Sequence, residues 1–328
     1  MNNLEALASV TRLSESVVRV LGQNPGKFTL QGTNTYIVGK QRPFTLIDTG
    51  EGREEYIPIL ESALKEAAKD SDAQETDVSD IVISHWHHDH VGGLPGVLAL
   101  LRKLWDERNV STPFKPPRLH KFPMAEAHPR DETSSLLASL SADAYAPAAS
   151  GNAFHNLGDG QIINTLRVLH TPGHTPDSIA LHVPGDNALY TADTILGQGS
   201  AVFEDLAVYM RSLQTMLDFV KENNAGKLYP GHGPVVKDGT ELISMYITHR
   251  QERDKQLLEL LRSKPEGGGP WTTWTMVTNL YKSYPQALWE PAAHSVDLHM
   301  RKMQGEGLVR KLGGEERHTQ WEIVQAKI

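Results

Sequence analysis

The sequence contains no cysteine. This absence excludes disulfide bonds, cysteine nucleophiles and thiolate metal sites, and it leaves histidine, aspartate and glutamate as the metal ligands. The sequence also lacks the ~18 uninterrupted apolar residues that a membrane-spanning helix needs. Its first thirty residues lack a basic start followed by a compact apolar run, so we expect no secretory signal. We therefore expect a cytoplasmic protein that does not enter a membrane, with the mitochondrial matrix as the alternative compartment.

A basic excess is missing as well. The 328 residues carry 32 Lys and Arg against 40 Asp and Glu. Residues 1–240 hold 20 basic and 29 acidic side chains, and residues 241–328 hold the remaining 12 and 11. Nucleic-acid binders usually show a clear basic excess, because neutralising phosphates supplies much of their affinity. This balance weighs against an RNA or DNA substrate, although a metal pair could still recruit phosphate locally.

The order of the expected elements indicates an α/β domain followed by a mainly helical one. Apolar and polar residues alternate in short segments that end in glycine turns, which predicts strands; apolar residues at helical spacing predict helices between them. We expect strands within 16–22, 33–39, 43–50, 78–85, 166–174, 178–185, 187–197 and 227–234, and helices within 53–70, 92–107, 132–145, 241–264, 271–284 and 291–312. This order places active groups at strand ends.

We divide the chain into two domains on this pattern. Residues 1–239 form the expected catalytic domain, in which the proline-rich and irregular stretch 106–160 is interpreted as a variable loop or lid. Residues 240–328 form the expected helical C-terminal domain. The sequence leaves the oligomeric state open.

The segment "HWHHDH", residues 85–90, follows an expected strand and holds four histidines and an aspartate. Its spacing could direct two imidazoles to one metal, and a carboxylate with an imidazole to another. A surface loop with chance histidines is the alternative. A metal site needs partners elsewhere, and three later segments supply candidates at strand ends: "TPGHT" with His174, "TADT" with Asp193 and "PGHGP" with His232. Each could be an ordinary turn or cap, but their joint occurrence favours a metal site.

These motifs, with "LIDTG" upstream, resemble the metallo-β-lactamase fold superfamily. The wider segments "RVLGQNPGKFTLQGTNTYIVG" and "DTILGQGSAVFEDLAVYMRSL" are similar to its LACTB2-like branch, which includes thioesterases of fungal polyketide gene clusters. The resemblance implies an α/β fold, an αββα sandwich with a small, helical, winged-helix-like C-terminal domain. It also implies a site for two Zn²⁺ ions, with Mn²⁺ or iron as alternatives. The implied ligands are His85, His87 and His174 for one metal, Asp89, His90 and His232 for the other, and Asp193 as the bridge.

Other residues near these motifs have less specific expectations. We expect His88 at the rim of the site and Asp48 in a hydrogen-bonded supporting role. Thr33 and Asn34 could contact substrate or form a structural turn. The aromatic residues within 271–284 could stack on an aromatic substrate, but their helical spacing is more typical of core packing.

The resemblance implies a dinuclear hydrolase that uses a metal-bridging hydroxide, with Asp89 as a catalytic proton donor. An acyl thioester or ester is the preferred substrate, carried on an acyl carrier protein or as a small acyl compound. Animal relatives cut single-stranded RNA, so an endoribonuclease is the main alternative. A non-catalytic, metal-stabilised interaction protein is a remote third, because it would not require a complete ligand set.

Overall fold

The computed structural model describes residues 4–109, 111–126 and 128–324. Within these residues the strands form a seven-stranded sheet, β1-β2-β3-β4-β5-β6-β7, a five-stranded sheet, β12-β11-β10-β9-β8, and a three-stranded sheet, β13-β15-β14. The strands of the first sheet are β1 Val10–Arg12, β2 Val17–Leu21, β3 Asn34–Val38, β4 Phe44–Ile47, β5 Val78–Ile83, β6 Arg118–Lys121 and β7 Phe154–Asn156. The other strands are β8 Ile162–Ile163, β9 Leu166–His170, β10 Ile179–Val183, β11 Ala188–Ala192, β12 Lys227–Pro230, β13 Trp271–Thr272, β14 Val309–Gly313 and β15 Gln320–Ile323.

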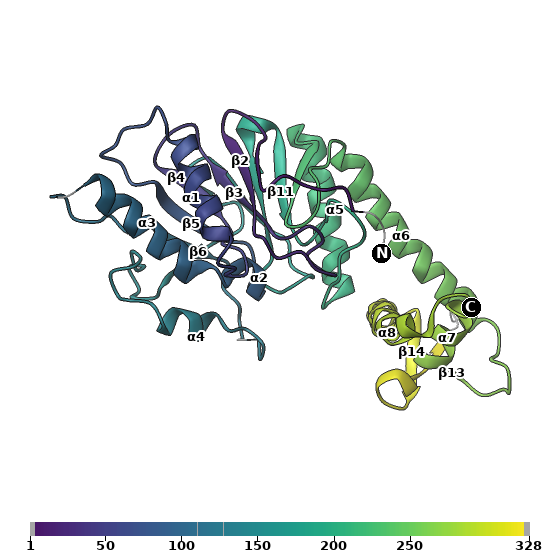
Figure 1. Cartoon of the computed structure of the whole chain (residues 1–328). Coiled ribbons are helices and arrows are strands. Elements are labelled where there is room, and N and C mark those ends of the chain that lie inside the picture. The colour runs from purple at the N-terminus through teal and green to yellow at the C-terminus, as the bar shows by residue number, and fades with distance from the viewer. Residues whose placement is uncertain (1–3, 110, 127, 325–328) are drawn as a thin grey trace.

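The helices cover the outer faces of the two larger sheets, α1 and α3 on one side and α5 with α6 on the other (Figure 1). Their bounds are α1 Tyr56–Ala67, α2 His88–Val91, α3 Leu94–Arg108, α4 Thr133–Ala138, α5 Leu206–Asn223, α6 Gly239–Leu261, α7 Thr273–Leu280 and α8 Trp289–Gly305. Short 3₁₀ helices occur at Pro184–Asp186, Gln286–Leu288 and Glu316–His318. Among the described residues, no helix is long and apolar enough to cross a membrane.

Strand β5 shows why the two large sheets pack into a sandwich. Successive strand side chains point to opposite faces, so Ile81 and Ile83 pack against α1 and α3 while Val82 faces the second sheet. Strand β10 does the same from the other side: Ala180 packs toward α5, and Leu181 packs between the sheets. Because both faces of each sheet are covered, these strands are almost continuously apolar. The expected αββα sandwich is confirmed.

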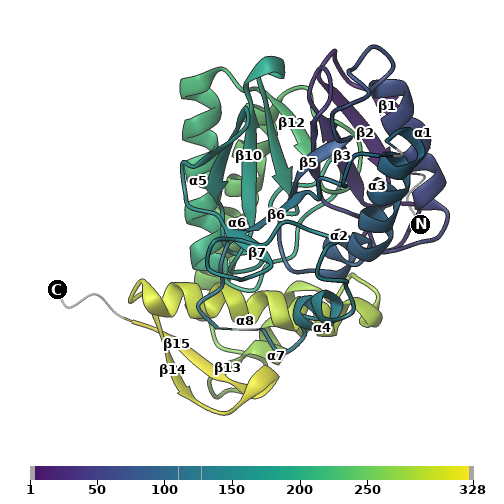
Figure 2. The same cartoon turned by 90° about the vertical axis from the view of Figure 1, so that its left-hand side faces the viewer.

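The C-terminal residues form a separate core around α7, α8 and the three-stranded sheet. Helix α8 lies along one end of the sandwich, with the small sheet on its far side (Figure 2). Trp271 is buried in this core, and Trp274 packs edge-to-face on Trp289 with their ring centroids 6.0 Å apart. Trp271 and Trp274 therefore pack internally, as their spacing predicts, whereas Tyr284 at the end of the segment is 54% exposed.

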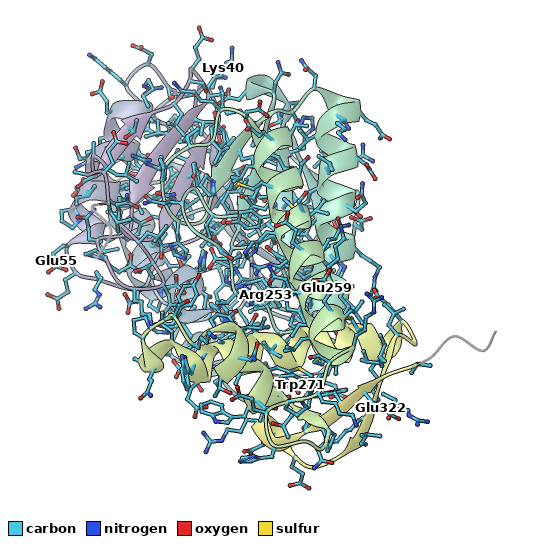
Figure 3. The ribbon with its side chains drawn as sticks, turned by 90° about the vertical axis from the view of Figure 1, so that its right-hand side faces the viewer. Lys40, Glu55, Arg253, Glu259, Trp271 and Glu322 are labelled. Atoms are coloured by element: carbon cyan, nitrogen blue, oxygen red, sulfur yellow. The ribbon has the colours of Figure 1, made fainter. Side chains whose placement is uncertain are left out.

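Helix α6 belongs to both cores. Ile243 and Tyr246 pack with α5 and the second sheet, whereas Leu257 and Leu261 pack in the C-terminal core. Figure 3 shows the helix continuing from the sandwich into the C-terminal unit. The expected boundary at residue 239 stays a prediction, since one helix serves both units.

Several elements differ from the sequence-based expectation. Helix α5 was not anticipated, and the helix expected from residue 271 begins at Thr273, because Trp271 and Thr272 pair with β15. The irregular stretch 106–160 contributes two strands, β6 and β7, which pair in parallel with the first sheet. Strand β6 contains the polar residues Arg118 and His120, which hydrogen-bond to Asp80 of β5. Its sequence therefore lacks the apolar alternation by which a strand is predicted.

Candidate metal centre

The histidine cluster lies where β5 ends, and the chain turns there into the single-turn helix α2. The turn sends His85 and His87 to one side and Asp89 and His90 to the other. The side chains predicted as ligands are thereby brought together in two groups, in each of which the potential ligand atoms lie within 4.8 Å of one another. The first group is His85, His87, His174 and Asp193, and the second is Asp89, His90 and His232. Their role as ligands stays a prediction.

The outward nitrogens of the imidazole rings are held by hydrogen bonds. His174 Nδ1 lies 2.8 Å from the carbonyl oxygen of Val202, His90 Nδ1 lies 2.7 Å from Asp48 Oδ2, and His232 Nδ1 lies 3.3 Å from the carbonyl oxygen of Gly32. His85 Nδ1 lies 3.0 Å from Ser84 Oγ. Such outer partners set the orientation and tautomer of histidines that bind metal.

The inward nitrogens, by contrast, face one another. His87 Nδ1 lies 3.0 Å from His85 Nε2 and 3.0 Å from His174 Nε2. When the outer nitrogen of His85 and of His174 donates its proton, the inner nitrogen presents a lone pair, and lone pairs that converge repel unless a cation lies between them. This donor set of imidazoles and carboxylates fits a divalent metal such as zinc.

Asp193 lies between the two groups. Its Oδ1 is buried without a hydrogen-bond partner among the described residues, although His90 Nε2 is 3.4 Å away. Its Oδ2 lies 3.2 Å from His232 Nε2 and 3.7 Å from His174 Nε2. A buried and unsatisfied carboxylate oxygen is costly, and a shared metal pair would satisfy it.

The electrostatics of the two groups differ. Burial and then the His174 imidazole lower the pKa of His87 to about 3, so it is neutral at physiological pH. Burial opposes charge on His232 too, but Asp193 and Asp89 outweigh it and raise its pKa to about 9. The pKa of Asp89 is lowered by His90 and His232 despite burial, which would raise it. A metal ion bound at the second group would therefore displace a proton from His232.

The backbone around the site is shaped to bring these side chains close. Asp48 and Ala192 both have positive φ angles, of 58° and 45°, which are uncommon for non-glycine residues. A Cβ on Gly231 would lie 2.3 Å from Asp193 Oδ1, so only glycine leaves room for that carboxylate. In the "TPGHT" turn, Gly173 has a φ of +128° and packs against the backbone of Tyr209.

Asp48 has the supporting role that the sequence predicts. Its fully buried carboxylate accepts hydrogen bonds from the backbone N–H and hydroxyl of Ser84, at 2.7 and 2.8 Å, from Tyr190 at 2.5 Å, and from His90 Nδ1. Because the Ser84 hydroxyl donates to Asp48, its oxygen is free to accept from His85. One carboxylate thus orients histidines of both groups.

Replacing Asp48 with asparagine is expected to weaken zinc binding by about 10- to 100-fold, because the outer partners of ligating histidines contribute about that much to metal affinity. The asparagine side chain would place an NH₂ group, itself a donor, where the carboxylate of Asp48 now accepts hydrogen bonds. Competition against a fluorescent zinc chelator measures the effect. Unchanged affinity in a folded Asp48→Asn protein would show that this network does not orient the histidines.

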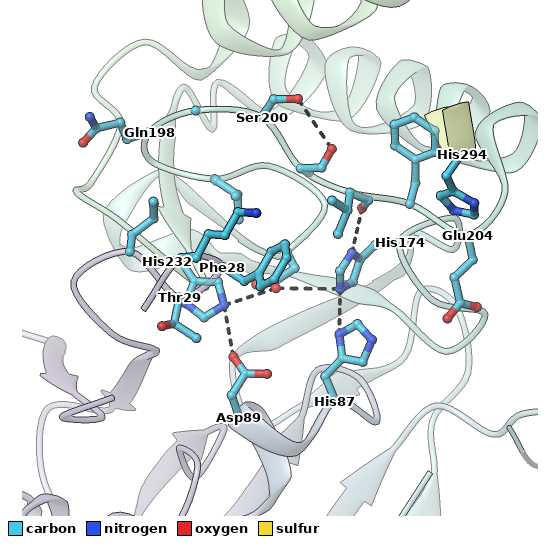
Figure 4. Close-up of a pocket in the computed structure, with 18 of the residues that line it drawn as sticks. Phe28, Thr29, His87, Asp89, His174, Gln198, Ser200, Glu204, His232 and His294 are labelled. Atoms are coloured by element: carbon cyan, nitrogen blue, oxygen red, sulfur yellow. Dashed lines mark hydrogen bonds and ion pairs between the residues drawn. The ribbon is translucent and has the colours of Figure 1, made fainter. Parts of the chain in front are cut away.

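A cavity of about 530 Å³ opens over these two groups. Its lining includes apolar side chains, Phe28, Leu30, Leu196, Val202 and Phe203, together with Lys27, Arg130, Gln198, Ser200, Glu204 and His294. Figure 4 shows Asp89, His87, His174 and His232 on its floor, with Glu204 and His294 toward one end. Helix α8 supplies His294, so the C-terminal unit forms part of the cavity wall.

The structure places the residues for which the sequence gave less specific expectations, and it adds positions that the sequence did not indicate. Thr33 is buried, and its hydroxyl donates to Asp89 Oδ2 at 3.1 Å, while Asn34 donates to backbone carbonyls. Both residues therefore have a structural role in this fold. His88 lies at the rim beside Glu132, as expected. The carbonyl oxygens of Val202 and Gly32 carry no residue-type signal and could not have been found from sequence.

Residues 28–232 match the family described as the metallo-beta-lactamase superfamily, and residues 272–321 match the beta-lactamase associated winged helix domain. The chain is 35% identical to the beta-lactamase-like protein 2 homolog of Drosophila melanogaster, over 93% of each chain. It is 32% identical to an atrochrysone carboxyl ACP thioesterase of Pseudocercospora fijiensis, over 99% of this chain and 86% of the relative. A beta-lactamase domain protein from Burkholderia ambifaria has the same fold, with a TM-score of 0.67 at 15% identity, over 98% of this chain and 96% of that one.

Proposed function

The chain belongs to the metallo-beta-lactamase superfamily of metal-dependent hydrolases, and we propose that it hydrolyses an acyl thioester or ester, with an acyl group on a carrier protein as its natural substrate. The apolar wall of the cavity carries this proposal. Phe28 and Val202 at the cavity are 68% and 58% exposed, so two apolar side chains are open to a ligand. Exposed apolar side chains in a concave site are typical of sites that bind apolar groups.

The residues of the two groups would hold a pair of divalent metal ions, which we propose to be zinc. His85, His87 and His174 would hold one ion, Asp89, His90 and His232 the other, and Asp193 would bridge them. Bound there, two divalent cations would lower the pKa of water to about 7 and polarise the scissile carbonyl oxygen. The activated water would then serve as the nucleophile, which is consistent with a chain that has no cysteine.

Asp89 is the proposed general acid. Its side chain keeps 23% exposure to the cavity, and its contacts with Thr33, His90 and His232 all involve Oδ2. This arrangement leaves Oδ1 as the atom that would carry a proton to the departing group. The buried hydroxyl of Thr33 donates to Oδ2 and so helps to fix the orientation of the carboxylate.

RNA is the second candidate substrate, because Lys27 and Arg130 lie at the cavity together with the exposed ring of Phe28. Cations and an aromatic ring are what a single-stranded nucleic acid needs for its phosphates and bases. However, two cations are few for binding a polyanion, and the carboxylate of Glu204, which also lines the cavity, would repel phosphates. An acyl chain fits this balance better.

The test pairs one zinc-loaded preparation with two substrates, an aryl or acetyl thioester and a fluorescent single-stranded RNA. A double variant, His85→Ala with Asp89→Asn, controls for contaminating hydrolases. We expect thioester turnover that the double variant loses, with the RNA left intact. RNA cleavage that the double variant loses, without thioester turnover, would replace the acyl-hydrolase proposal with the ribonuclease.

A further inference from the structure

The loop between Leu196 and Asp205 crosses the candidate metal centre from one group to the other. At its start, the backbone N–H of Gly197 donates to the carbonyl oxygen of His232 at 2.9 Å. At its end, the N–H of Glu204 donates to the carbonyl oxygen of Gly173 at 2.7 Å. Between these points the Val202 carbonyl oxygen accepts from His174 Nδ1. The position of this loop therefore sets the orientation of His174.

Helix α6 holds the middle of the loop through two side chains. The Tyr246 hydroxyl donates to the carbonyl oxygen of Gly199 at 3.0 Å and accepts from the N–H of Leu196 at 3.4 Å. Arg250 Nη2 donates to Ser200 Oγ at 2.6 Å and to the carbonyl oxygen of Ala201 at 3.1 Å. Arg250 thus contacts the peptide immediately before Val202.

Arg250 also stacks on the residue that follows Val202. Its guanidinium carbon lies 4.8 Å from the centroid of the Phe203 ring, which itself stacks on Tyr209. A cation over an aromatic face is attracted by the ring, and more strongly in a desolvated site. Ser200, Ala201 and Phe203 are all fixed by one side chain, so the Val202 carbonyl between them has little freedom to move.

The surroundings of Arg250 are unusual for a residue that serves stability alone. The side chain is 7% exposed, and its Nε has no hydrogen-bond partner among the described residues. Burial lowers its pKa, and the neighbours that counter burial most are the tyrosines Tyr209 and Tyr246, not a carboxylate. A buried charge without a carboxylate is costly, and a well-packed apolar side chain often replaces it without loss of stability.

We propose that Arg250 is a positioning residue for the metal centre. By fixing residues 200–203 it holds the Val202 carbonyl against His174 Nδ1, which turns His174 Nε2 toward the first group of ligands. The loop's hydrogen bond to His232 of the second group comes from Gly197, outside the residues that Arg250 contacts, so we expect its effect on the metal ion of the first group. This inference rests on the proposed function in so far as the site binds two metal ions.

The experiment compares Arg250→Met with Arg253→Met. Arg253 lies one turn further along α6 and also places its guanidinium over an aromatic ring, that of Tyr281 at 4.9 Å, but in the C-terminal unit. Both variants remove a cation from the same helix and leave a side chain of similar length. Arg250→Lys is the conservative variant, since lysine keeps the charge but lacks the planar guanidinium.

Zinc affinity is measured for both ions by chelator competition, with thermal unfolding in parallel. We expect Arg250→Met to bind one zinc ion like the wild type and the other about 10- to 100-fold more weakly, Arg250→Lys to recover part of that loss, and Arg253→Met to bind both ions normally. Two normal affinities in Arg250→Met, or an equal loss of both with a lower unfolding temperature, would overturn the inference. A wild-type protein that binds fewer than two zinc ions would refute the metal centre itself, and the inference with it.

Discussion

Replacing Asp193 with asparagine is expected to lower kcat/KM by about 10³-fold or more and to reduce bound zinc below two ions per chain. Asp193 is the carboxylate that lies within 3.7 Å of histidines from both groups. Its loss removes the shared negative charge between two cations, and metal-ion catalysis is worth several kcal/mol, of which each 1.4 kcal/mol is a factor of ten in rate. Metal analysis of the purified variant, alongside steady-state kinetics, measures both effects.

Asp218→Asn is the matched control, because Asp218 is an exposed aspartate on α5 that pairs only with Gln214 among the described contacts. It should keep both zinc ions and full turnover. Chelator treatment of the wild type should reproduce the kinetic loss, and added zinc should reverse it. Two retained zinc ions and full turnover in Asp193→Asn would show that the carboxylate does not join the two metal sites.

Replacing Asp89 with asparagine is expected to lower kcat by about 10²- to 10⁴-fold on an alkyl ester, the usual range for loss of a general acid. The reduction should be smaller on a thioester. A thiol leaving group has a pKa near 8.5, about that of cysteine, so it departs as thiolate with little help, whereas an alkoxide needs the proton from Asp89. The two substrates therefore separate loss of proton donation from loss of metal.

Metal content has to accompany this measurement, because Asp89 is also a proposed ligand. A variant that keeps two zinc ions and loses more activity on the alkyl ester than on the thioester supports the general-acid role. Equal losses on both substrates, together with one missing zinc ion, would assign Asp89 to metal binding alone. Full turnover with both metals retained would remove Asp89 from the catalytic machinery.

Most of the candidate metal site could be predicted from short sequence segments. Four histidines and an aspartate within six residues could be interpreted directly. His174, Asp193 and His232 stood out because each follows an expected strand, and His174 and His232 also lie beside glycines. Strand ends on one edge of a sandwich converge, so residues at those ends are brought together without any further information. The structure brings all seven side chains together in this way.

The supporting residues were harder to find for a physical reason. Asp48 was identified because it stands in "LIDTG", one of the segments that carry the family resemblance, and its four hydrogen bonds confirm the expected supporting role. The Val202 and Gly32 carbonyls are backbone groups, which every residue possesses, so nothing in the sequence distinguishes them. Arg250 lies 76 positions after His174, and its arginine could equally have been a solvated residue on an amphipathic helix.

The residue pattern predicted the fold class, and the motifs that carry the family resemblance predicted a metal-dependent hydrolase. The alternating strands predict an α/β layer structure, and the absence of cysteine restricts the metal ligands to histidine and carboxylates. The three-dimensional packing was needed to show that α6 connects the candidate metal centre to the C-terminal unit, and that His294 forms part of the cavity wall. Periodicity and composition report which side of an element is buried, whereas contacts between distant segments depend on how the elements pack.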